Sequence, residues 1–164
     1  MKKTILVLVG LFIAIQFFQI DTTPKKKTTG GDFFSIYSTN DTLKTLIKNA
    51  CYDCHSYETK YPFYSKIAPL SWFIDDHIVD GRKHLNFSIW NTYSLKRKTK
   101  KLEESIEEIE EENMPLNSYL ILHSEAKLNE INKEKLIEFF EQILKQETKN
   151  KLILQNEEKQ NEEK

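Results

Sequence analysis

The sequence predicts a single all-α domain, and three observations lead to that prediction. Apolar residues recur at helical spacing in several segments of the 164-residue chain. No segment around the two cysteines, Cys51 and Cys54, shows the alternation of apolar and polar residues that marks a strand. The cysteines follow directly on the first predicted helix of the domain. With 39% hydrophobic and 30% charged residues, the chain suffices for one small core and is too short for two ordinary domains.

Residues 1–20 have the composition of an export signal. Lys2 and Lys3 precede an apolar run from Ile5 to Phe18. The end of that run lacks the small residues of a cleavage site, so we expect an uncleaved membrane anchor in preference to a cleaved signal peptide. The two lysines predict a cytoplasmic N-terminus, which places the domain in the periplasm or an equivalent compartment, tethered to the inner membrane.

Composition also sets the boundaries of the domain. Residues 21–34 contain lysines, threonines and two glycines without an apolar period, which is typical of a linker. Residues 147–164 are mostly Lys, Glu, Gln and Asn, and they have too little apolar surface to offset the entropy lost on ordering. We therefore expect the domain to occupy residues 35–146 and the tail to be disordered.

Four segments of the domain have the apolar spacing of helices. The first, residues 40–51, is capped by an asparagine and leads into the cysteines. The second, residues 69–82, begins with a proline and is expected to bury Trp72 and Phe73. The third, residues 96–112, carries many charges and one narrow apolar stripe, so it is expected to lie on the surface.

The last of the four helices is expected to close the core. Asn132 can cap its first turn, and a broad apolar face follows before Glu147. The residues of that face are Leu136, Ile137, Phe139, Phe140, Ile143 and Leu144.

The segment from Cys51 to His55 has the sequence C-Y-D-C-H, and this spacing lets two thiols bond to the vinyl groups of one haem. The adjacent imidazole of His55 is then placed to bind the iron. Because the chain has no other cysteine, one haem c would account for both thiols. The motif therefore predicts Cys51 and Cys54 as covalent attachment residues and His55 as the proximal iron ligand.

Two other uses of the cysteines remain open. A redox-active C-x-x-C pair is the stronger alternative, although such a pair normally lies between a strand and a helix. A zinc site would combine both cysteines with two histidines, although a second C-x-x-C pair or a closely spaced histidine pair is missing. The candidate histidines are His55, His77, His84 and His123.

A haem iron bound by His55 needs either a second ligand or an open position. Met114 is the only methionine beyond the initiator, and Pro115 after it favours an extended turn at a helix end. A thioether ligand favours ferrous iron and so raises the reduction potential. We therefore predict Met114 as the distal iron ligand, with the remaining three histidines as competitors.

Several separated stretches of the sequence carry a common resemblance: 49–56, 61–72, Asp76-His77, Gly81-Arg82, 84–88, and Met114-Pro115-Leu116 with Tyr119 and His123. Together they resemble the bacterial haem-binding domain family of small exported cytochrome-c-like proteins, over residues 35–145. The resemblance implies covalent haem c on both cysteines, proximal ligation by His55, distal ligation by Met114 and a cytochrome-c-like helical fold. It implies no particular physiological partner.

An aromatic block, residues 61–90, lies between the two predicted iron ligands. We expect it to wall the haem from water, which also tunes the reduction potential. Its alternative roles are to hold a haem propionate through Arg82 or an aromatic donor, or to shape a substrate pocket. The expected wall residues are Tyr64, Trp72, Phe73, Phe87 and Trp90.

These residues predict a monohaem c-type cytochrome that transfers electrons outside the cytoplasm and is not an enzyme. We expect a monomer whose partner is another redox protein, and a net charge of −1 gives no indication of nucleic-acid binding. The alternative is a haem-based gas or redox sensor, or a peroxidase-like enzyme. In that alternative Met114 is displaced from the iron, and His77 or His84 acts on the bound ligand.

Overall fold

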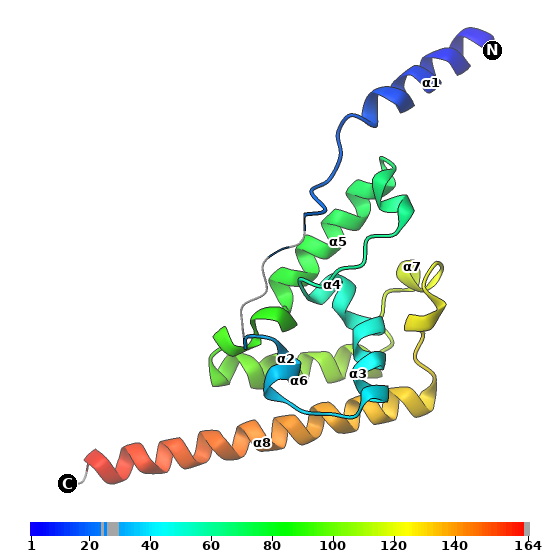
Figure 1. Ribbon diagram of the computed structural model, residues 1–164. Coiled ribbons are helices and arrows are strands. Elements are labelled where there is room, and N and C mark those ends of the chain that lie inside the picture. The colour runs from blue at the N-terminus through cyan, green and yellow to red at the C-terminus, as the bar shows by residue number, and fades with distance from the viewer. Residues whose placement is uncertain (24, 26–29, 163–164) are drawn as a thin grey trace.

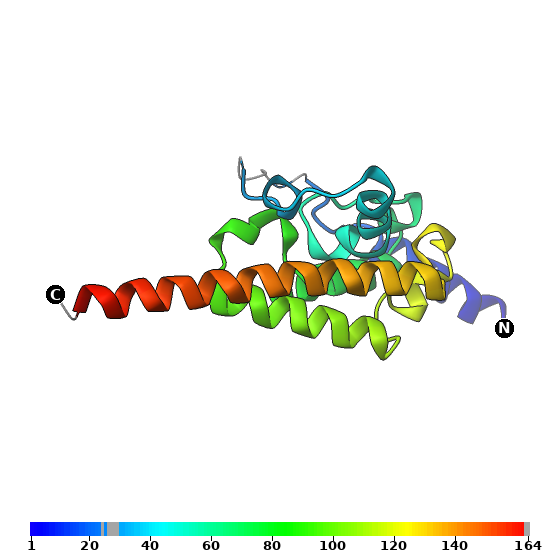
Figure 2. The ribbon, with the colours of Figure 1, turned by 90° about the horizontal axis from the view of Figure 1, so that it is seen from below.

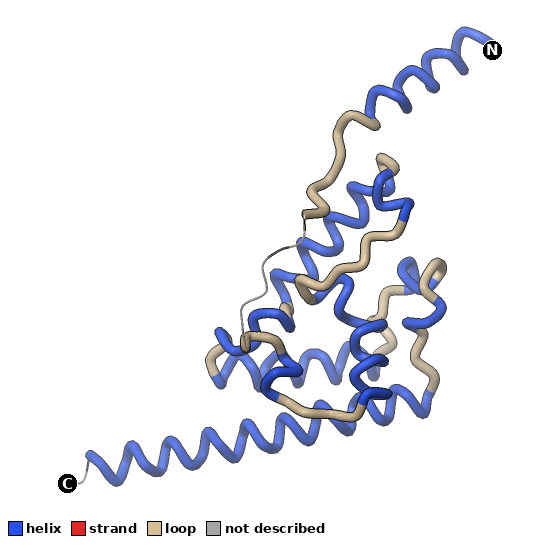
Figure 3. The backbone as a smooth tube through the Cα atoms, in the orientation of Figure 1, coloured by secondary structure: helices blue, strands red, loops and turns tan. Residues whose placement is uncertain are grey.

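The computed structural model describes residues 1–23, 25 and 30–162, and this part of the chain contains helices and loops but no strand (Figures 1 and 3). The predicted all-α class is therefore confirmed for these residues. The longer helices are α1 (Lys2–Ile15), α3 (Asp41–Ile47), α5 (Leu70–His84), α6 (Leu95–Glu110) and α8 (Glu130–Glu162). The short elements are α2 (Phe33–Ile36), η1 (Lys48–Tyr52), α4 (Asp53–His55), η2 (Phe63–Lys66), η3 (Phe87–Thr92), α7 (Asn117–Leu120) and η4 (Ser124–Ala126).

The two helices α6 and α8 lie antiparallel along one another and form the base of the domain (Figure 2). The apolar stripe predicted for the charged helix supplies Leu102 and Ile109, which are buried. On α8, Leu136, Phe140 and Ile143 are buried in the same core. The prediction that the last helix closes the core is therefore confirmed.

Phe33 is fully buried, although its sequence context predicted that it belongs to the linker. Its ring centroid lies 5.1 Å from those of Phe87 and Trp90. The domain thus begins before residue 35. A lone pair of phenylalanines between glycines and polar residues has no periodicity from which its burial could be predicted. Part of the predicted linker, residues 24 and 26–29, lies outside the described residues.

Helix α5 follows Pro69 as predicted, but the prediction that Trp72 and Phe73 are buried is wrong. Their side chains are 40% and 51% exposed. The buried positions of this helix are Ser71 and Ile78. Positions 71 and 78 lie two turns apart and so share one face, whereas 72 and 73 lie on neighbouring faces. The prediction depended only on the aromatic character of Trp72 and Phe73, and it therefore assigned burial to the wrong face of the helix.

Helix α1 ends at Ile15 and projects away from the core (Figure 1). The apolar run of the sequence continues beyond it to Phe18. Among the described residues, no helix combines the length and the apolar composition needed to cross a bilayer.

Both ends of α8 differ from the prediction. The carboxamide oxygen of Asn129 accepts a hydrogen bond from the Asn132 backbone N–H (2.8 Å), so Asn129 caps the helix in place of Asn132. At its other end the helix continues to Glu162, where a disordered tail from residue 147 was expected. Glu, Lys and Gln have high helix propensity, so this segment can extend a helix without burying apolar surface.

Candidate functional site

The C-x-x-C-H motif lies on one helical stretch formed by η1 and α4. The π-helical turn Lys48–Tyr52 leads directly into Asp53–His55, and such widened turns are frequent at functional sites. Ile47, the last residue of α3, is fully buried and anchors the stretch to the core. The side chains of Cys51 and Cys54 are each partly buried, so they lie at the edge of the core.

A cavity of about 620 Å³ lies beside this stretch and is lined by residues of α4, α5, α6 and α8. Its volume is within the range of small-molecule and cofactor sites. Cys51, Cys54, His55 and Met114 all line it, so the structure brings together the four residues that the sequence singled out. The apolar wall consists of Ala50, Leu85, Phe87, Ile109, Pro115, Leu116, Leu128, Leu136 and Phe140.

The imidazole of His55 is oriented by the C-terminal part of α5. Its Nδ1 lies 3.0 Å from the carbonyl oxygen of Gly81 and 3.2 Å from that of Leu85. Carbonyl oxygens only accept, so Nδ1 carries the proton and Nε2 keeps a free lone pair. Burial lowers the pKa of His55, which keeps the ring neutral. A neutral ring with an available Nε2 is the form that binds a metal.

Helix α5 can approach the motif this closely because residue 81 is glycine. A Cβ atom added at Gly81 would lie 3.0 Å from the Cys54 carbonyl oxygen and 3.3 Å from the Cys54 Cβ. Both distances are tighter than ordinary van der Waals contact, and the nearer atom belongs to the backbone, which cannot rotate away. The glycine therefore sets the spacing between α5 and α4, and with it the His55 hydrogen bonds.

Gly81→Ala is expected to lower the free energy of unfolding by about 1–3 kcal/mol, the usual cost of overpacking. An ordinary helical glycine behaves in the opposite way, since alanine there stabilises by about 1 kcal/mol. Denaturant unfolding of the haem-loaded protein measures the change. Lys83→Ala, on the exposed side of the same helix, is the matched control and should change stability little. Stabilisation by Gly81→Ala would show that the close approach is not needed.

The thiols do not have the properties of a redox-active pair. Burial raises the pKa of Cys51 to about 12 and that of Cys54 to about 11. A reactive C-x-x-C cysteine instead has a lowered pKa, because the thiolate is the nucleophile. Within the described ranges there is also no strand to precede the motif. The same ranges contain no cluster of three His, Cys, Asp or Glu side chains that could hold a metal, so the zinc alternative finds no support.

The segment that carries Met114 is held by the end of α6. Glu112 adopts a left-handed backbone (φ 59°), which ends the helix. The backbone N–H groups of Asn113 and Met114 then both donate to the carbonyl oxygen of Glu108, each at 3.0 Å. Met114 is half-buried at the cavity. The prediction that it follows a helix end is confirmed.

Tyr119, which follows Met114 on α7, fastens this segment to the motif. Its hydroxyl donates to the carboxylate of Asp53 at 2.8 Å and lies 3.3 Å from the carbonyl oxygen of Asn49. Burial, followed by the nearby Asp53 charge, raises the pKa of Tyr119, so the hydroxyl remains a donor. The family resemblance includes Tyr119 but does not pair it with Asp53, since a tyrosine and an aspartate 66 residues apart show no local pattern that would pair them.

Tyr119→Phe is expected to lower the free energy of unfolding by about 1.5–3 kcal/mol, because it removes a hydrogen bond to a charged acceptor. If Met114 is the iron ligand, the freed segment should also release it more readily, and exogenous imidazole should then bind ferric haem faster. Stopped-flow absorption measures that rate. Tyr61→Phe, a neighbouring tyrosine that does not bond to Asp53, is the control. Equal rates in both variants would mean that the Asp53 bond does not hold the segment.

Of the six residues expected around the haem, only Phe87 lines the larger cavity. The other five do not: Tyr64, Trp72, Phe73, Arg82 and Trp90. Trp72 is exposed near the start of α5. Arg82 donates through Nε to the Ser56 carbonyl oxygen and through Nη2 to the Thr59 hydroxyl, both at 2.8 Å, so it fastens the loop after the motif. A lysine that does line the cavity is Lys101 of α6, and it pairs with Glu104, which lines the cavity too. Sequence reasoning missed it because it lies within a charge run typical of a solvated helix.

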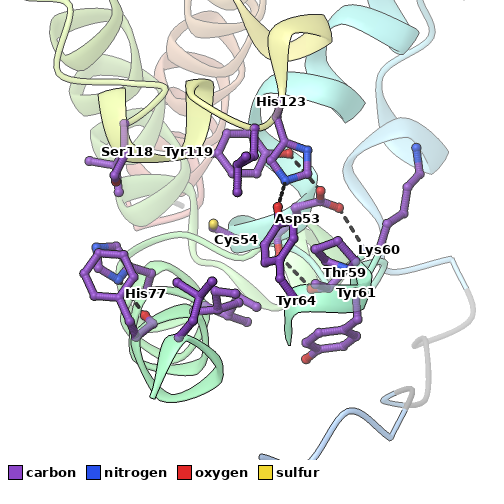
Figure 4. A pocket seen from close by; sticks show the side chains of 17 residues that line it. Asp53, Cys54, Thr59, Lys60, Tyr61, Tyr64, His77, Ser118, Tyr119 and His123 are labelled. Carbon is purple, nitrogen blue, oxygen red and sulfur yellow. Dashed lines mark hydrogen bonds between the residues drawn. The ribbon is translucent and has the colours of Figure 1, made fainter. Parts of the chain in front are cut away.

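Tyr64 instead lines a second, smaller cavity of about 100 Å³ (Figure 4). Its hydroxyl lies 2.5 Å from Nε2 of His123, whose Nδ1 lies 3.1 Å from the Glu125 carboxylate. His123 therefore belongs to this neighbouring cavity. His77 and His84 both line the larger cavity and stay competitors of Met114 for the iron.

The chain is similar to one family of known proteins over most of its length. The profile of the haem-binding domain family matches residues 10–142. No curated protein and no solved structure matches the chain. The match covers most of the sequence and includes all four cavity residues predicted to hold the haem and its iron. The chain therefore belongs to the haem-binding domain family.

Proposed function

We propose that this protein is a monohaem c-type cytochrome that carries electrons outside the cytoplasm. The observation that carries the proposal is the larger cavity, in which Cys51, Cys54, His55 and Met114 meet. Two thiols, a neutral imidazole with an available Nε2 and a thioether form the donor set of a His/Met c-type site. The residues present thus fit one haem c.

Each residue has a distinct part in this proposal. Cys51 and Cys54 would hold the haem through thioether bonds, and His55 and Met114 would bind its iron. When bound, the haem supplies the one-electron chemistry. The hydrogen bonds from His55 to the α5 carbonyls orient the ring and raise its basicity as a ligand. The apolar wall would exclude water, and the Lys101 ammonium, which now pairs with Glu104, would pair with a haem propionate by exchanging partners.

The N-terminal segment supports a location outside the cytoplasm. Helix α1 begins with two lysines, and apolar residues follow them, which is the order of an export signal. In that location the protein would exchange electrons with another redox protein and act as a monomer, without catalysing a reaction of its own.

A second candidate function follows from His77 and His84, which line the same cavity as Met114. If Met114 leaves the iron, either imidazole could donate a proton or hydrogen bond to an exogenous ligand. The protein would then be a gas or redox sensor, or a peroxidase-like enzyme.

The absorption spectrum of the full chain, produced in a host with cytochrome c maturation, tests both candidates. We expect a low-spin c-type spectrum that carbon monoxide does not alter in the ferrous form, and haem that stays attached on denaturation. A carbon monoxide-sensitive spectrum would favour the sensor or enzyme. Absence of covalent haem would contradict the proposed cytochrome and return the cysteines to thiol chemistry.

A further inference from the structure

We propose that the domain rests on a lipid bilayer through a cluster of exposed aromatic and aliphatic side chains, here called the aromatic tip. The tip lies where helix α1 joins the domain, at the N-terminal end of α5 (Figure 1). Its side chains are between 39% and 83% exposed. They are Phe17, Phe18, Phe63, Ile67, Leu70, Trp72 and Phe73.

The end of α1 is clamped to the tip by three hydrogen bonds. The carboxamide of Gln16 donates to the Ala68 carbonyl oxygen (2.9 Å) and accepts from the Ala68 N–H (3.0 Å). The indole N–H of Trp72 donates to the Phe18 carbonyl oxygen at 2.7 Å. Ala68 is fully buried, so the clamp is part of the domain. Any surface that takes up α1 is therefore brought against the tip.

The exposed side chains of helix α1 indicate that the aromatic tip contacts lipid and not a partner protein. None of its residues is buried, and its large apolar side chains, from Ile5 to Ile13, are 49–71% exposed. A helix that is apolar on all sides needs an apolar medium all round it, whereas a partner protein would cover one face. Lipid supplies such a medium. Trp and aromatic side chains are enriched where a bilayer meets water, and the exposed Lys66 beside the tip suits lipid phosphates.

This contact would hold the haem cavity at a set height above the membrane. Trp72 and Gly81 are nine residues apart on α5, which is about 13 Å along a helix axis. The membrane contact does not depend on bound haem. An experiment that disproves the contact would therefore leave the proposed cytochrome function untouched, and the reverse also holds. The contact would extend the attachment made by the N-terminal segment to side chains of the folded domain.

Fluorescence quenching by brominated lipid tests the contact, because bromine quenches tryptophan only at short range. The full chain is reconstituted in phosphatidylcholine vesicles, with and without bromine near the head-group end of the acyl chains. Trp90 is 1% exposed and serves as the internal reference. We expect bromine to quench the wild type, and Trp72→Phe to abolish that quenching because only the buried Trp90 remains. Haem quenches the tryptophans equally in both kinds of vesicle. The ratio of the fluorescence in brominated vesicles to that in unbrominated vesicles therefore reports the bromine effect alone.

A double variant separates the tip from α1. Phe63→Ser/Phe73→Ser keeps α1, the clamp and Trp72, and it should reduce the quenching by about half or more, since the tip loses apolar contact area. Ile131→Ser, an equally polar change at a side chain 62% exposed on α8, is the matched control and should leave it unchanged. Wild-type quenching no greater than that of Trp72→Phe would overturn the proposal. The proposal would also be overturned if the protein formed a concentration-dependent dimer that the Phe63→Ser/Phe73→Ser change dissociates. That result would show that the aromatic tip binds a second copy of the chain.

Discussion

Replacement of both Cys51 and Cys54 by alanine is expected to abolish the cooperative unfolding of the domain. The cavity measures about 620 Å³, and at about 24 cal/mol per Å³ a dry void of that size would cost about 15 kcal/mol. A typical domain is stable by only about 5–15 kcal/mol. Water entering the open part of the cavity lowers the cost, but it does not replace the apolar contacts that the haem would make with Phe87, Leu136 and Phe140.

Circular dichroism during urea unfolding measures this effect, with the haem-loaded wild type as reference. The variant should show a broad, shallow loss of helix where the wild type shows one transition. Added free haem should restore part of the cooperativity, because His55 and Met114 are retained and binding stabilises the folded state. A sharp transition in the variant without haem would show that the aromatic core around Phe33 suffices to fold the chain.

Met114→Ala is expected to convert the iron from low spin to high spin and to open it to carbon monoxide. The thioether is the distal donor proposed here, and alanine offers no lone pair in its place. Carbon monoxide binding to the ferrous protein should change from undetectable to saturable, and the reduction potential should fall. Absorption spectra with and without carbon monoxide, followed by a redox titration, measure both changes.

Leu116→Ala is the matched control for the Met114 variant, because Leu116 lies in the same segment and lines the same cavity but has no donor atom. It should keep a low-spin spectrum. If Met114→Ala also keeps one, the iron takes its second ligand elsewhere. His77→Ala and His84→Ala would then identify which imidazole supplies it, since both side chains line the cavity.

The parts of the site that sequence reasoning predicted are those encoded by local spacing. Cys51, Cys54 and His55 lie within one short motif, and Met114 lies at a helix end marked by a proline. Both signals depend only on a few neighbouring residues. The helical class and the core face of α8 were predictable for the same reason, because helical periodicity is a local property.

The contacts that join distant segments could not be predicted. The Gly81 and Leu85 carbonyls that hold His55, and the hydroxyl of Tyr119 on Asp53, depend on how the helices pack. Trp72 was misplaced because two adjacent apolar residues on a helix do not reveal which face is buried. Arg82 lies far from the motif in sequence, yet packing turns it toward the loop that follows His55.

The hydrogen bonds between His55 and α5 also bear on protein engineering. A five-residue C-x-x-C-H cassette transplanted onto another helix would bring the two attachment points and the imidazole. It would not bring the pair of carbonyls that selects which ring nitrogen is protonated. A designer would need a second helix crossing the cassette, with glycine at the crossing point to admit it. The smallest portable unit of this site is therefore a pair of helices.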